Sequence, residues 1–185
     1  LLDPAQGIDR VTDIYIQKEN VVALGEAPRD FEPQRRIDAA GRLVIPGVVD
    51  MAARLREPGQ EHKATVASET RAAASAGITT LVCPPDTNPP VDSPAEVELI
   101  TRRAKQACGV RVHALGALSA GLAGEQLSEM AALKRAGVLG VSQALKPMAS
   151  HLLLRRAMEY AASHGLTVYL HPIDWSLNAK GCVHE

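Results

Sequence analysis

Short apolar runs that alternate with helical stretches constrain the fold of this chain more than any other feature of its sequence. From residue 43 onward, stretches with helical periodicity lie near 61–76, 93–107, 125–136 and 150–164. The apolar runs between them recur about every 30 residues, the size of a βαβ repeat. This alternation predicts an α/β fold with a parallel sheet. The five runs are Leu43–Asp50, Ile78–Cys83, Val110–Leu115, Val138–Val141 and Leu166–His171.

The residues at the borders of these stretches support the same division. Ser93 and Pro94, with Glu96 three residues after the serine, match an N-cap, a proline at the first helical position and a capping-box partner. A glycine follows three of the helical stretches, where a left-handed C-cap is required. Five such strands fit either an open doubly wound sheet or an incomplete barrel, and periodicity alone leaves both open. The three glycines are Gly77, Gly137 and Gly165.

The first 45 residues have a different pattern. Short, partly alternating runs at Val11–Gln17, Val21–Gly25 and Arg35–Ala39 are separated by turn-forming residues, including Pro28 and Pro33. Such runs are typical of a small sheet with tight turns. We therefore expect a boundary between a small β portion and the βα repeats.

Composition excludes several classes of protein. The 185 residues are 46% hydrophobic, and 20 Lys and Arg balance 21 Asp and Glu to a net charge of -1. With no block of like charges, neither nucleic acid nor a membrane surface is indicated as a partner. The longest apolar runs, such as Leu43–Val49, are much shorter than the roughly 20 residues that cross a bilayer. The sequence predicts a soluble, cytoplasmic protein.

Cysteine usage and the chain ends add two expectations. The three cysteines are widely spaced and form no Cys-x-x-Cys pair, so we expect neither a disulfide framework nor a zinc knuckle. Leu1 in place of Met, and the absence of a stop signal before Glu185, predict a fragment of a longer chain.

Four segments resemble one enzyme family in the same order. They are PGVVDMAARLREPG, GITTLVCPPDTNPP, GALSAGLAGEQLSEMAALKRAG and the strand that ends in His171, and they are similar to the dihydroorotase branch of the amidohydrolase superfamily. The resemblance implies a partial (β/α)8 TIM barrel of the amidohydrolase type. Residues 1–45 would form part of a small β-sandwich, and residues 46–185 the first half of the barrel.

The resemblance also implies a binuclear zinc site, whose first ligands come from an Asp-x-His-x-His motif. Here Ala52 and Arg54 occupy the two histidine positions after Asp50. Residues two apart on a strand face the same way, so all three should face the barrel mouth. Arg54 at ~4 Å from a dication would be repelled by about 8 kcal/mol at an effective dielectric constant of ~20. We expect zinc to be excluded, with Arg54 either paired to Asp50 or solvated.

Two further positions bear on the metal site. Where the family has Ser-Asp-Asp-Gly-Lys/Arg-Pro, this chain has Ser142 to Pro147, with Gln143 and Ala144 in place of the carboxylates and Lys146 expected at the surface. His171 matches a ligand histidine, but one imidazole cannot hold zinc, which needs three or four protein ligands. We expect hydrogen bonds to hold His171, with Asp174 as its neighbour or a helix N-cap. His113 is expected in the core or at the rim.

Arg56 and Asn88 match positions that hold the carboxylate and the ring of dihydroorotate in the family. Arg suits a carboxylate because its donors form a planar fork. The alternative is that both residues belong to rigid Pro- and Gly-containing turns and bind nothing. The sequence leaves these two interpretations open.

Within the family, the chain resembles most the non-catalytic dihydroorotase-like chains that some bacteria pair with aspartate carbamoyltransferase. The resemblance implies an inactive protein without cofactor, in a hetero-oligomer with the catalytic chain of that transferase, in pyrimidine biosynthesis. One alternative is an active cyclic amidohydrolase with an altered metal site. The second is a binding module for dihydroorotate or carbamoyl aspartate.

Overall fold

A computed structural model describes residues 1–107 and 109–173 of the chain. It divides into two compact units, Leu1–Gly47 and a second that begins at Val48. No helix within these described residues is long and apolar enough to cross a membrane.

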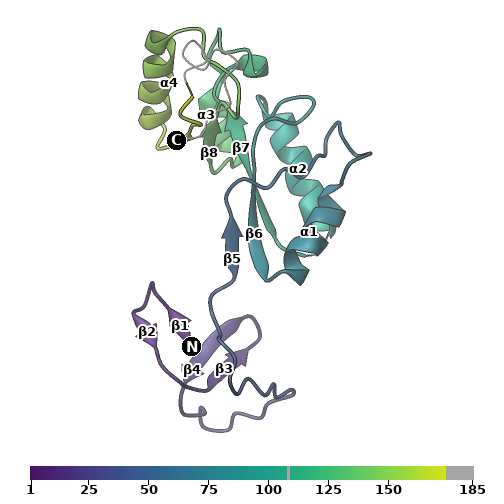
Figure 1. Ribbon diagram of the computed structural model, residues 1–185, viewed down its shortest axis with the longest axis vertical. Coiled ribbons are helices and arrows are strands. Elements are labelled where there is room, and N and C mark those ends of the chain that lie inside the picture. The colour runs from purple at the N-terminus through teal and green to yellow at the C-terminus, as the bar shows by residue number, and fades with distance from the viewer. Residues whose placement is uncertain (108, 174–185) are drawn as a thin grey trace. The chain divides into compact units, whose positions relative to one another are not determined.

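The first unit consists of two antiparallel strand pairs (Figure 1). Strand β1 (Leu2–Asp3) pairs with β2 (Ile8–Asp9), and β3 (Ile14–Gln17) pairs with β4 (Asn20–Leu24). The sequence pattern located β3 and β4 but missed the two-residue strands β1 and β2. It was wrong about Arg35–Ala39, which forms no strand. All five of these residues are exposed, so no packed surface favours an extended, paired backbone there.

The second unit contains a curled parallel sheet whose strands are ordered as they occur in the chain, β5-β6-β7-β8-β9. A doubly wound sheet would reverse this order at a switch point, whereas a barrel does not. The order confirms the predicted α/β class and a partial barrel. The strands are β5 (Val48–Asp50), β6 (Ile78–Cys83), β7 (Arg111–Ala117), β8 (Gly140–Ser142) and β9 (Thr167–Tyr169).

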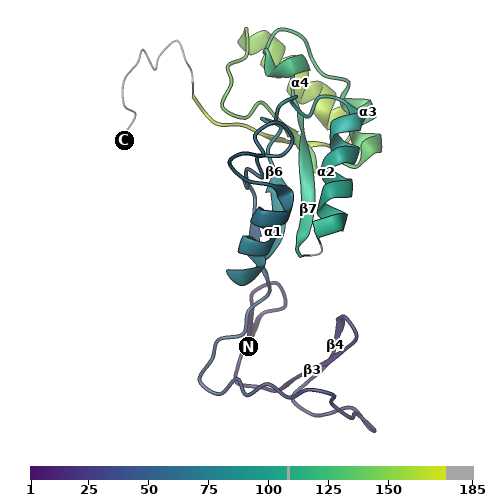
Figure 2. The ribbon, with the colours of Figure 1, turned by 90° about the vertical axis from the view of Figure 1, so that its right-hand side faces the viewer.

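Four α-helices and one 3-10 turn connect these strands. Helices α1 and α2 lie side by side against β6 and β7 (Figure 2), and α3 packs beside α2. The core lies between helices and sheet, and residues such as Leu81, Ile100 and Leu133 are almost fully buried in it. The helical elements are α1 (Val66–Ser75), α2 (Pro94–Ala107), η1 (Ala120–Leu122), α3 (Met130–Ala136) and α4 (His151–Ser163).

Capping groups set the starts of the helices. The Ser93 hydroxyl accepts the Ala95 N–H at 3.3 Å, so Ser93 caps α2 as the sequence pattern predicts. Glu96, predicted as a capping-box partner, accepts from the Ser93 hydroxyl through its Oε2 at 2.5 Å. Helix α1 begins later than the predicted residue 61, because Thr65 and Ser68 form a reciprocal capping box there. Helix α3 is shorter than predicted, since Leu127 forms a β-bridge with Ser119 instead of a helical turn.

The carboxyl ends of the strands place the candidate site residues, and those of β7 and β9 differ from the predicted runs. Strand β5 ends at Asp50, so residues 51–54 are not in a strand. Strand β7 runs on to Ala117, which places His113 inside the strand rather than at its carboxyl end. Strand β9 ends at Tyr169, two residues before His171.

Replacement of Gly140 by alanine should destabilise the sheet. A Cβ at this position would lie 2.5 Å from the carbonyl oxygen of Thr167 and 2.7 Å from the ring of Tyr169. Overpacking of this kind costs about 1–3 kcal/mol of unfolding free energy, measurable by chemical denaturation. Gly109→Ala is the matched control, because its Cβ would lie 3.4 Å from the carbonyl oxygen of Thr70. Equal stability of the two variants would contradict the tight β8–β9 packing.

Candidate functional site

The backbone turns immediately after β5. The Asp50 carboxylate accepts the N–H of Ala52 at 2.9 Å, which closes a turn at Met51 and Ala52. A side chain that bonds the backbone two residues on competes with strand pairing. The expectation that residues 50, 52 and 54 share one strand face is therefore wrong.

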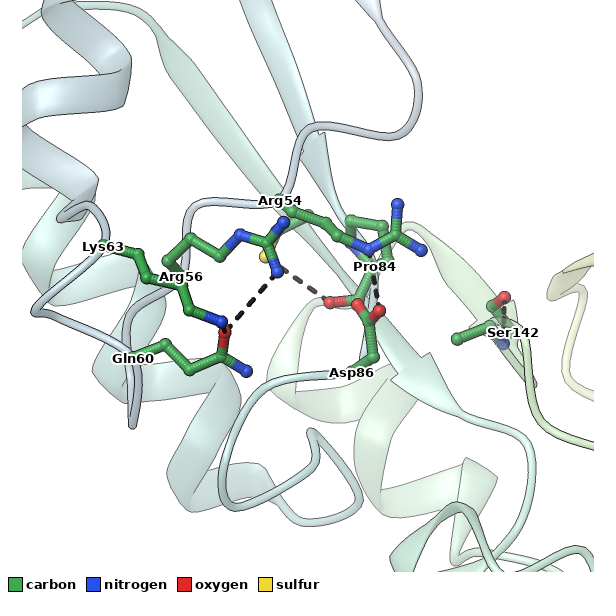
Figure 3. A network of polar contacts seen from close by, with 9 residues as sticks. Arg54, Arg56, Gln60, Lys63, Pro84, Asp86 and Ser142 are labelled. Carbon is green, nitrogen blue, oxygen red and sulfur yellow. Dashed lines mark hydrogen bonds and ion pairs between the residues drawn. The ribbon is translucent and has the colours of Figure 1, made fainter.

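Arg54 forms an ion pair with Asp86 in the loop that follows β6 (Figure 3). Its Nε lies 2.8 Å from Asp86 Oδ2, and the two side chains are 33% and 27% exposed. Neither predicted state of Arg54, a pair with Asp50 or a solvated side chain, is correct. Asp50 is engaged in its own turn, and parallel pairing of β5 with β6 brings Asp86 within reach.

A small cavity adjoins this ion pair. Arg54, Arg56, Gln60 and Asp86 are among its lining residues, and its volume of about 10 Å³ has room for roughly one water molecule. Cys83 also lines the cavity and is buried, with Sγ 3.5 Å from the carbonyl oxygen of Pro84. Burial raises the pKa of the Cys83 thiol to about 11, against a smaller lowering effect of a backbone hydrogen bond from Leu55. The thiol is therefore protonated at neutral pH.

The loops that carry Arg56 and Asn88 pack directly against each other. The Asn88 N–H donates to the carbonyl of Pro58 at 3.1 Å. Gly59 lies so close that a Cβ there would be 2.2 Å from the Asn88 carbonyl oxygen. Arg56 has a positive φ of 64°, and its Nη1 donates to Gln60 Oε1 at 3.5 Å. The structure thus brings together the two loops whose residues match substrate-binding positions of the family.

Glu57, which the sequence analysis did not single out, anchors the first of these loops. Its Oε2 accepts the N–H of Val66 at the start of α1 at 2.9 Å, and its Oε1 lies 3.1 Å from Nε of Arg103 on α2. The side chain is only 12% exposed. The dipole of α1 favours a carboxylate at its N-terminus. The second partner of Glu57, Arg103, lies on the neighbouring helix α2 and becomes apparent only in the folded structure.

A second polar cluster joins the loops after β7 and β8. The buried side chain of Gln143 donates to the carbonyls of Leu122 at 3.1 Å and Pro147 at 3.4 Å. Its Oε1 accepts from the hydroxyl of buried Ser119 at 2.9 Å. The sequence offered no sign of Ser119. Ala144 has a positive φ of 52°, and its N–H donates to Ser142 Oγ at 3.0 Å.

The remaining predicted residues lie at the surface of this part of the chain. Lys146 is exposed, as expected. His113 is exposed on β7, and His171 is exposed beyond the end of β9. Within residues 1–107 and 109–173, hydrogen bonds do not hold the His171 imidazole. Asp174 lies outside the described residues.

The residues described do not fit the zinc pair that the resemblance implies. Ala52 has no ligand atom, and the Arg54 guanidinium is already bound to Asp86. Nowhere in the described ranges do three His, Cys, Asp or Glu side chains gather in a way that could hold a metal ion.

Comparison with known proteins identifies the family. The family model for dihydro-orotase-like proteins matches residues 41–185. The chain belongs to this family. It is 46% identical, over all 185 residues, to a dihydroorotase-like protein of Pseudomonas aeruginosa and 43% identical to one of Pseudomonas putida. It is 41% identical to a dihydroorotase of Geobacter sp. (strain M21). The chain spans 44% of the length of each of these relatives.

A solved structure supports the fold of this dihydro-orotase-like chain. L-hydantoinase (dihydropyrimidinase) from Arthrobacter aurescens superposes with a TM-score of 0.74 at 24% sequence identity. The match covers 86% of this chain and 36% of the hydantoinase. At this identity the likeness shows the fold alone, and it agrees with the partial barrel.

The Cys83 thiol should resist alkylation in the folded protein. A pKa of about 11 instead of 9.0 lowers the thiolate fraction at pH 8 by roughly 100-fold, and the thiolate is the nucleophile. Peptide mapping after iodoacetamide treatment should find Cys83 unmodified in native protein and alkylated after denaturation. Rapid native labelling would contradict the burial of this thiol.

Proposed function

We propose that this chain is part of a non-catalytic dihydroorotase-like protein that acts as a structural partner of aspartate carbamoyltransferase in pyrimidine biosynthesis. The observation that carries the proposal is the Arg54–Asp86 ion pair. A guanidinium lies where the family resemblance implies a zinc-binding imidazole. A fixed cation in that place repels a metal ion and offers no ligand atom for it.

The electrostatics of the site support this proposal. A guanidinium stays protonated at any physiological pH and has no lone pair to donate to a metal. At ~4 Å it would repel a dication by about 8 kcal/mol at an effective dielectric constant of ~20. The Asp86 carboxylate at 2.8 Å offsets part of this repulsion, but the neutral amide of Gln143 and the methyl group of Ala144 supply no carboxylate ligand for a metal ion.

The partner is proposed from family resemblance. A barrel that keeps its strands, caps and buried core without a fitted metal site still offers its outer surface to another protein. The name dihydroorotase-like protein, given to the relatives of 46% and 43% identity, is compatible with a protein distinct from the enzyme.

The first alternative is an active zinc-dependent dihydroorotase, or another cyclic amidohydrolase, with an altered metal site. The Geobacter relative named dihydroorotase favours it. The second alternative is a binding module for dihydroorotate or carbamoyl aspartate. The direct packing of the Arg56 and Asn88 loops favours that alternative, since it holds both residues without a metal.

Metal content and turnover separate the proposal from the first alternative. The whole protein, purified in zinc-supplemented buffer, should contain less than stoichiometric zinc by elemental analysis and should show no dihydroorotase turnover in either direction. The double substitution Ala52→His and Arg54→His should not restore turnover, because Gln143 and Ala144 still lack a carboxylate. Tightly bound zinc together with turnover in the unmodified protein would establish the enzymatic alternative.

Assembly tests the proposed partner. The whole protein, co-expressed with the aspartate carbamoyltransferase of the same organism, should elute with it as one complex in size-exclusion chromatography. The transferase alone should be less stable, because a partner that binds only the folded state stabilises it by mass action. Arg54→Ala should leave the complex intact, since this residue lies in the loop at the carboxyl end of β5 rather than on an outer helix.

Two outcomes would count against this assembly. One is separate elution of the two proteins at micromolar concentration with full transferase activity. The other is a calorimetric signal for dihydroorotate or carbamoyl aspartate binding to the free dihydroorotase-like protein, which would favour the binding module.

A further inference from the structure

The loops after β5 and β6 are joined by the Arg54–Asp86 ion pair (Figure 3). The backbone contact of Pro58 and Gly59 with Asn88 joins the same two loops. We propose that Arg54 is a positioning residue whose positive charge has the structural role that a bound cation would have. Held by Asp86, it fixes the loop that carries Arg56 against the loop that carries Asn88. This inference rests on the proposed absence of zinc, which elemental analysis tests separately.

The partial burial of the Arg54–Asp86 pair makes the loss of either charge costly. Both side chains are about two-thirds shielded from solvent, with exposures of 33% and 27%. An unpaired charge at such a position loses part of its hydration without compensation, whereas a fully exposed ion pair contributes little. Because the Arg54 Nε donates directly to a carboxylate oxygen at 2.8 Å, the direction of the guanidinium is also fixed.

A backbone contact close in sequence to Asp86 links the position of the ion pair to the position of the two loops. Asp86 is two residues from Asn88, whose N–H donates to the carbonyl of Pro58 at 3.1 Å. Gly59 meets the Asn88 backbone with no space for a side chain, so a shift of either loop must break this contact. The ion pair and the backbone contact therefore fix the two loops at two successive points.

Each loop also has an anchor of its own. Glu57 fastens the first loop to Val66 and Arg103 on the helices. The second loop is closed by the Val91 N–H, which donates to the carbonyl of Pro85 at 3.1 Å. With both loops anchored separately, the Arg54–Asp86 pair controls their relative placement rather than their folding. Its loss should loosen the contact between the loops and leave the sheet intact.

Hydrogen exchange at the Asn88 amide tests this role in the whole protein. Arg54→Ala and Asp86→Ala should each accelerate exchange at this amide by about tenfold, the effect of losing one charge-assisted hydrogen bond. The double substitution should accelerate it no further than either single one, because both remove the same interaction. Asp86→Asn, which keeps the size of the side chain, should act like Asp86→Ala, and Arg54→Lys should retain part of the protection.

Two references separate a local effect from general loss of stability. The Leu118 amide, which donates to the carbonyl of Ser142 at 2.9 Å, should exchange at an unchanged rate in every variant. Glu159→Ala removes the exposed ion pairs with Arg155 and Arg156 on α4 and should leave Asn88 unaffected. Unchanged exchange at Asn88 in Arg54→Ala, multiplicative effects in the double variant, or equal acceleration at Leu118 would each overturn the proposal.

Discussion

Parallel pairing of the five strands in chain order is the constraint on which the rest of this structure depends. Because neighbours in sequence are neighbours in the sheet, the loop after each strand lies beside the loop after the next one. The loops after β5 and β6 are therefore brought together, as are those after β7 and β8. Each pair of loops is joined by polar side chains, through Arg54 and Asp86 in the first case and Ser119 and Gln143 in the second.

The two links differ in chemistry because their surroundings differ in water access. Arg54 and Asp86 keep about a third of their surface in solvent, which lets full charges persist there. Ser119 and Gln143 are 0% and 1% exposed, and an unpaired ion at that depth would be costly. Neutral groups with every hydrogen bond satisfied suit the dry position, and a network of this kind gains strength from the low local dielectric constant.

The sequence predicted the order of strands and helices because apolar periodicity and helix caps are local signals. It placed the ends of the strands less well. Asp50 ends β5 through a side-chain bond to Ala52, and this competition with the sheet cannot be read from hydrophobicity. The turn at Met51 and Ala52 undid the prediction that Arg54 faces the same way as Asp50.

The sequence also did not predict which side chains interact when they come from loops after different strands. The sequence identified Arg54 as anomalous, but its counter-ion lies 32 residues away and is found only when the strands are paired. Ser119 and Glu57 escaped notice for the same reason, since each is defined by contacts with distant backbone or side chains. Arg56 and Asn88 were found through family resemblance, and the structure added that their loops touch.

The environment of Gln143 has a consequence for how this protein can change over generations. Its amide nitrogen faces the carbonyl oxygens of Leu122 and Pro147, so a carboxylate introduced there would oppose two acceptors and lose both bonds. Any lineage that moved from the amide to an acidic residue in one step would pass through a less stable protein. Selection for stability alone is therefore sufficient to retain the amide at position 143, without any selection for catalysis.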